Sequence, residues 1–160
     1  MKELLIKLNA CPPAIDWAGD KSWEEIYKTC HRGDWLLWLF EEVNPADVRL
    51  RVLVAGHCAN TVRHLMKHQI SRDAVDGAIA FGEGKIDEDT LDKLARAARA
   101  ARAYYAHYAA YYAAAATATA ANAATATAAN ASDNPEANQL ETANIVRKLI
   151  PIEKFNIDLK

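Results

Sequence analysis

The stretch SWEEIYKTCHRGDWLLWLFEEV, residues 22–43, holds the clearest folding signals in the chain. Ser22 stands three residues before Glu25, which is the capping-box pattern of a helix N-terminus. We therefore predict a helix from Trp23 to Cys30. The basic residues His31 and Arg32, followed by Gly33, indicate where this helix ends.

The second half of this stretch predicts another helix. Asp34 is of the residue types that cap helix N-termini, and an apolar run with two tryptophans follows it. We expect this helix to span Trp35 to about Val43, where Asn44-Pro45 ends the helix or starts a new one. Two helices joined at a glycine favour an all-α fold.

Helical signals continue on both sides of this stretch. Apolar side chains recur at helical spacing, and no convincing pair of strands is present. The further helices that we expect span residues 11–17, 46–70, 71–80, 88–131 and 135–150. Of these, the helix over 46–70 contains no breaker except Gly56. The sequence thus predicts a single compact all-α domain of several helices over residues 1–160.

An arm rich in alanine, threonine and asparagine occupies about residues 95–131. A helix from Glu88 to about Ala131 would be roughly 66 Å long, so it either protrudes straight or folds back as a hairpin. Within it, TATAANAA over residues 117–124 is nearly repeated over 125–132. Each copy turns by roughly 80° on a helix, which spreads the threonines around the axis and argues against a flat ice-binding row.

Composition excludes several classes of protein. The 19 Lys and Arg against 21 Asp and Glu leave a formal net charge of −2, without the basic excess typical of nucleic-acid binding. No stretch predicts a membrane span or a signal peptide, so we expect a cytoplasmic protein. The three widely spaced cysteines fit reduced thiols better than disulfides. No catalytic or cofactor-binding motif is recognisable, and we expect neither enzymatic activity nor a bound cofactor.

Three histidines give the best metal hypothesis. His57, His64 and His68 would lie within an arc of roughly 40° if residues 46–70 were one helix. The four-residue spacing of His64 and His68 could then share a metal ion, with a third ligand from elsewhere. The alternative is a polar stripe at the edge of the buried face.

Aromatic side chains provide two candidate partner-binding surfaces. All four tryptophans lie in the first quarter of the chain, and five tyrosines lie on one arc of the long predicted helix. Such residues either pack in the core or form the contact surface for another protein. The candidate partner-binding residues are Trp35, Trp38, Tyr104, Tyr108 and Tyr111.

Three stretches resemble a known family. They are Cys11-Pro12-Pro13 with Trp17, the segment from Trp23 to Trp38 containing Arg32-Gly33-Asp34-Trp35, and Ala143 to Arg147 with Ile150-Pro151 behind it. The pattern is similar to immunity proteins of bacterial polymorphic toxin systems, a family also found on phages and prophages. Arg32-Gly33-Asp34-Trp35 and Trp38 are its most specific part, and the Thr/Asn repeat departs from it.

The resemblance implies an all-helical protein that neutralises a toxin or effector by binding it directly. The expected partner is therefore a protein. From the charge balance and the hydropathy we expect no binding to nucleic acid or to a membrane. Two alternatives stay open. One is a phage-encoded factor against host defence that binds a small molecule or a host protein, and the other is a metal-dependent enzyme that uses the histidine stripe.

Overall fold

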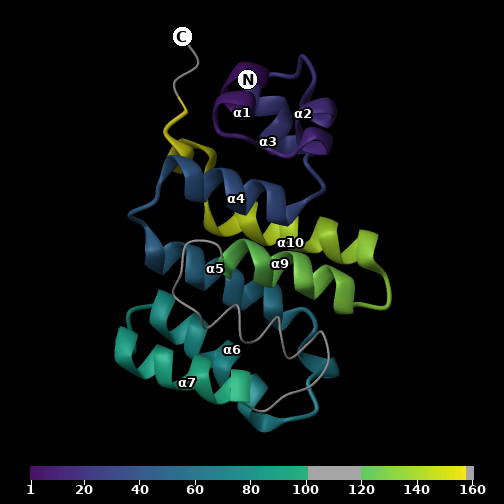
Figure 1. Cartoon of the computed structure of the whole chain (residues 1–160). Coiled ribbons are helices and arrows are strands. Elements are labelled where there is room, and N and C mark those ends of the chain that lie inside the picture. Colours follow the sequence, from purple (N-terminus) through teal and green to yellow (C-terminus); the bar gives the residue numbers. More distant parts are fainter. Residues whose placement is uncertain (101–119, 158–160) are drawn as a thin grey trace.

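The computed structural model describes residues 1–100 and 120–157, and the described part of the chain is all-helical with no strand (Figure 1). The prediction of an all-α fold is therefore confirmed. No helix within these two ranges is both long enough and apolar enough to cross a membrane.

Three short helices form the N-terminal layer, which lies above α4 in Figure 1. They are α1 (Lys2–Lys7), α2 (Pro12–Ala18) and α3 (Trp23–Thr29). The capping box that the sequence predicts is present: the Glu25 amide donates to Ser22 Oγ at 3.2 Å, and the Ser22 amide donates to Glu25 Oε2 at 2.8 Å. Helix α1 has no side-chain cap and was not predicted.

The remaining helices pack in layers below. Helices α4 (Gly33–Val43) and α10 (Pro135–Leu149) lie side by side, and α9 (Ala120–Ala131) packs on both and on α5 (Val48–Asn60). Next, α6 (Gln69–Gly82) packs on α5, and α7 (Glu88–Ala100) packs on α6. The fully buried side chains come from most of these layers and include Leu36, Phe40, Val54, Val75, Leu91 and Val146.

Close contact between α4 and α10 explains the glycine at the centre of the opening stretch. A Cβ atom on Gly33 would stand 2.5 Å from Thr142 Oγ1 and 2.7 Å from the backbone nitrogen of Ala143. Gly33 is the first residue of α4, so the prediction that Asp34 caps a helix starting at Trp35 is wrong. Asp34 lies within the first turn, where its carboxylate is held by the Arg32 guanidinium instead of by backbone amides.

The prediction of one helix over residues 46–70 is also wrong, because this range is divided among three elements. Helix α5 ends at Asn60, a single 3₁₀ turn spans Arg63–Leu65, and α6 begins at Gln69. At the break, the Thr61 hydroxyl donates to the carbonyl of Cys58 at 2.7 Å and accepts from Asn138 Nδ2 of α10 at 2.8 Å. A contact with a distant helix thus stabilises the turn that brings α6 back against α5.

The two described ends of the predicted long helix, α7 and α9, pack on different neighbours. Helix α7 begins as expected after Asp87, whose Oδ1 accepts from the Thr90 amide at 2.9 Å. Its neighbour is α6, whereas α9 packs on α4, α5 and α10. The connection over residues 101–119 lies outside the described residues, and with it the choice between a straight arm and a hairpin.

The C-terminal helix follows its sequence signals. Asn134 caps α10 by accepting from the Ala137 amide at 3.1 Å, and the helix ends before Pro151 as predicted. The sequence did not predict the 3₁₀ turn that follows, over Ile152–Phe155. Phe155 is fully buried there, with its ring centroid 4.9 Å from that of Trp23 and 5.3 Å from that of Phe40. This ring links the N-terminal layer to α4.

Candidate functional site

Three aromatic rings meet at the surface where α2, the link between α3 and α4, and the first turn of α4 come together. The ring centroid of Trp17 lies 6.1 Å from that of Trp35 and 5.9 Å from that of His31, and His31 lies 6.3 Å from Trp35. His31 is exposed and both tryptophans are half-buried. This is an aromatic cluster with edges open to solvent, held by two helices.

A cation stacks on each tryptophan of this cluster. Lys21 Nζ lies 4.6 Å from the ring centroid of Trp17 and also donates to the carbonyl of Trp17. The Arg32 guanidinium carbon lies 4.7 Å from the ring centroid of Trp35. We call the five residues Trp17, Lys21, His31, Arg32 and Trp35 the Trp17–Trp35 surface.

Asp34 fixes the orientation of the Arg32 guanidinium. Arg32 Nε donates to Asp34 Oδ1 at 2.8 Å, and the second contact, from a terminal nitrogen to Oδ2, is 2.5 Å. The hydrogen bond to Asp34 raises the pKa of Arg32 further above its already high usual value. Because such a two-point ion pair has a defined geometry, it holds the flat guanidinium against the Trp35 ring.

An apolar cavity of about 30 Å³ lies beneath the Trp17–Trp35 surface. Trp17 and Trp35 form part of its wall, and Trp38, Leu5, Ile26 and Cys30 are among the other residues that line it. A space of this size admits a single small group and no drug-sized ligand. Trp38 is half-buried like Trp17 and Trp35 and lines the same cavity, so its predicted role in partner binding stays a prediction.

The tyrosine candidates lie outside the described residues. Tyr104, Tyr108 and Tyr111 belong to the range 101–119, so the second predicted partner surface remains a prediction from sequence.

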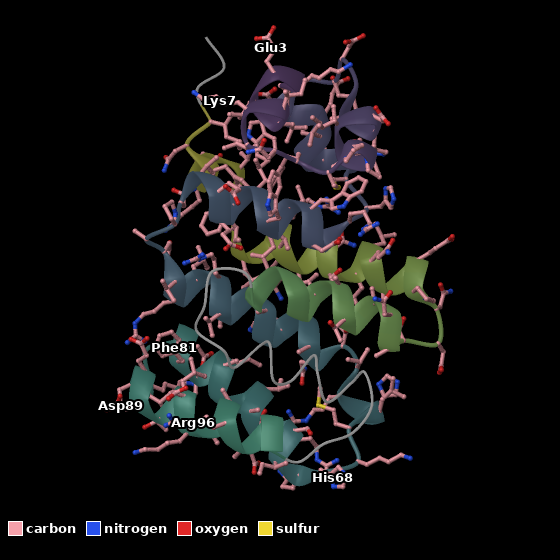
Figure 2. The ribbon with its side chains drawn as sticks, viewed as in Figure 1. Glu3, Lys7, His68, Phe81, Asp89 and Arg96 are labelled. Carbon is pink, nitrogen blue, oxygen red and sulfur yellow. The ribbon has the colours of Figure 1, made fainter. Side chains whose placement is uncertain are left out.

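The histidine candidates do not share a helix face. His57 belongs to α5, His64 to the 3₁₀ turn, and His68 precedes the first residue of α6. Figure 2 shows His68 at the end of the molecule opposite Glu3 and Lys7 of α1. Within the described ranges, no group of three or more His, Cys, Asp or Glu side chains is placed to hold a metal ion. The hypothesis depended on an unbroken helix, and the break removes the four-residue spacing as a reason for His64 and His68 to share a metal.

A buried ion pair lies at the other end of α4. Arg51, 3% exposed, places a terminal nitrogen 3.5 Å from Glu41 Oε1 and donates from the other to the carbonyl of Pro45 at 2.8 Å. Burial raises the pKa of Glu41, and the charge of Arg51 opposes that shift. Since both side chains are buried and one bonds the loop backbone, the pair ties α4 to α5 and offers no group to a substrate.

Lys21, His31 and Arg32 were not among the residues predicted to bind a partner, although two spacings indicate the cations. Lys21 follows Trp17 by four residues, and Arg32 precedes Trp35 by three, which are the spacings that bring a cation near a ring around a helix end. Only their three-dimensional position shows that both pairs share one surface.

No protein-family model matches the chain, and no curated protein or solved structure matches it either.

Proposed function

We propose that this chain is a non-catalytic binding protein of the immunity type, which neutralises a toxin or effector by docking on it through the Trp17–Trp35 surface. The observation that carries the proposal is a cluster of two tryptophans, a histidine and two cations at a solvent-exposed edge. Tryptophan and arginine are the residues most enriched among those that dominate protein–protein binding energies. The resemblance of residues 23–38 to immunity proteins supports the same function.

The arrangement of the surface also favours protein binding over a purely structural role. Each ring is held by a neighbouring cation or ring, so docking would immobilise few additional rotamers and lose little side-chain entropy. The rings are half-buried, which leaves edges and faces for a partner, and His31 is exposed beside them. A rigid amphipathic surface of this kind gives large contact area at low entropic cost.

The test uses the product of the gene adjacent to this one in its native locus. That product is expressed in a bacterial host with and without this chain, and growth is compared. The affinity of the purified chain for the product is also measured. We expect the chain to restore growth, and we expect complete inhibition of the toxin at one copy of the chain per toxin molecule. A chain that neutralised by turnover would act at far below one equivalent, which would contradict a non-catalytic mechanism.

Matched variants locate the surface. Trp35→Ala should weaken the dissociation constant by about 30-fold or more, as truncation of a central binding residue does. Arg32→Ala should weaken it as well. Arg96→Ala is the control, because it removes an exposed guanidinium from α7, away from the N-terminal layer (Figure 2). Equal affinities for Trp35→Ala, Arg96→Ala and the parent, with unchanged circular dichroism, would refute the proposed surface.

A further inference from the structure

The outer face of α10 has no neighbour among the described helices. Its inner face, with Asn138, Thr142, Ala143 and Val146, is buried. On the outer face Leu140 is 50% exposed, and among the described residues Ile6 is the one other large hydrophobic side chain counted as exposed. A shallow groove runs along this face and is lined by Ala137, Leu140, Glu141, Asn144, Ile145 and Lys148.

The order of side chains along the groove is self-complementary. Glu141 and Lys148 are seven residues apart, so they lie nearly on one line along the helix. They are also equally far from the midpoint between Asn144 and Ile145. A two-fold axis at that midpoint, perpendicular to the helix, would place Glu141 of each copy level with Lys148 of the other.

From this charge pattern we infer that the chain forms a two-fold symmetric dimer by antiparallel packing of α10 on α10 of a second copy. Two Glu141–Lys148 ion pairs then cross the interface, one on each side of the axis. Leu140 packs on the aliphatic stem of Lys148 of the second copy, and the two Ile145 side chains meet beside the axis. A parallel arrangement is disfavoured because it would place like charges level with each other.

The interface is small, which sets the expected affinity. One helix face against another buries less than the roughly 1,200 Å² of a stable specific interface. We therefore expect a dimer that dissociates on dilution, with a dissociation constant between about 10 μM and about 1 mM. The apolar contribution comes mainly from Leu140 and Ile145, and the ion pairs fix the register and direction of the two helices.

Sedimentation velocity of the full chain over a dilution series from about 5 μM to about 1 mM tests the inference. The weight-average mass should rise towards twice the monomer mass with increasing concentration. Leu140→Asp should abolish the rise, because it would place a carboxylate in the apolar part of the interface. Ile6→Asp is the matched control, since it alters the other exposed aliphatic side chain, on α1, and should leave the rise unchanged.

Exchanging the charges of Glu141 and Lys148 gives the decisive test. Glu141→Lys and Lys148→Glu should each weaken the dimer by about tenfold, because each variant sets like charges opposite each other. The double variant E141K/K148E restores opposite charges and should recover the affinity of the parent. A chain that stays monomeric at every concentration, or a dimer indifferent to Leu140→Asp and to the charge exchange, would overturn the inference.

Discussion

Replacing Gly33 by alanine should destabilise the protein, although alanine is the better helix former. The added Cβ would stand 2.5 Å from Thr142 Oγ1, 2.6 Å from the carbonyl carbon of Thr142 and 2.7 Å from the amide nitrogen of Ala143. Two of these three atoms belong to the backbone of α10, which cannot rotate away as a side chain can. Either α4 or α10 must therefore move.

The magnitude follows from two opposing terms. Inserting a methyl group into a closely packed contact costs about 1–3 kcal/mol, and backbone neighbours place this case towards the upper end. The gain in helix propensity from glycine to alanine offsets about 0.5–1 kcal/mol. A net loss of about 2 kcal/mol in the free energy of unfolding remains, which for a chain of this length lowers Tm by about 4–8 °C.

Urea denaturation followed by circular dichroism at 222 nm measures the loss. Gly77→Ala is the matched control, since the neighbours of its added Cβ are all side-chain atoms of Leu94, which can adjust. The double variant G33A/T142A removes the hydroxyl contact and leaves both backbone contacts, so it should stay well below the parent in stability. If Gly33→Ala is as stable as the parent, α4 and α10 do not approach as closely as these distances require.

Three further predictions concern the interior and the thiols. Arg51→Met should lower the free energy of unfolding by about 3–5 kcal/mol near pH 7, because it leaves the Glu41 carboxylate buried without a partner, whereas E41L/R51M should lose much less. Burial already raises the pKa of Glu41, so the folded state binds a proton at this carboxyl more tightly than the unfolded state does. The loss of unfolding free energy in Arg51→Met should therefore shrink as the pH falls through this raised pKa. Urea titrations at several pH values measure that change. In a thiol titration of the native chain near pH 8, only Cys11 should react promptly, because Cys30 is buried and burial raises the pKa of Cys58 to about 12. All three thiols should react in denaturant. Prompt reaction of Cys58 in the native state would contradict its burial. Arg147→Ala should lower the free energy of unfolding, measured by urea denaturation, by about 1.5–3 kcal/mol. The reason is that one guanidinium nitrogen of Arg147 donates to the carbonyls of Tyr27 at 3.0 Å and Cys30 at 2.8 Å. A loss near zero would show that water replaces both hydrogen bonds.

The helices that the sequence predicted well begin at local signals. Each of these signals acts within a few residues of the helix start. Free backbone amides of the first turn are satisfied by the side chains of Ser22, Asp87 and Asn134. Glu25 completes the first of these caps, and Pro135 suits the first turn of α10. Such caps act through neighbours in the sequence, so their effect can be inferred without knowledge of the fold. The starts of α3, α7 and α10 were correct for this reason.

The break after α5 could not be inferred in this way. Val62 and Met66 continue the apolar spacing of the helix before them, and both are buried in the structure. Their burial occurs in a turn instead of a helix, where Thr61 is held by Asn138, 77 residues later in the chain. Periodicity detects which residues are buried and not which element buries them, so the histidine hypothesis failed together with the helix.

The candidate site was partly visible in the sequence. The density of tryptophan indicated that residues 17–38 contain either core or contact surface, and the structure contains both: Trp23 is buried, while Trp17 and Trp35 reach solvent. Separating the two roles required the position of α2 relative to α4. No spacing within one helix contains that information.

The segment Arg32-Gly33-Asp34-Trp35 connects the stability of the fold with the proposed binding surface. Gly33 lets the start of α4 approach the backbone of α10, and the residues on either side of it carry the cation and the ring of the surface. A shift of α4 that relieves a contact at Gly33 would therefore also move Trp35 relative to Trp17, which belongs to α2. Loss of binding in a Gly33 variant would consequently not identify Gly33 as a contact residue. His31, which is exposed and lies before the first residue of α4, is a position at which affinity can change while the packing of α4 on α10 stays intact.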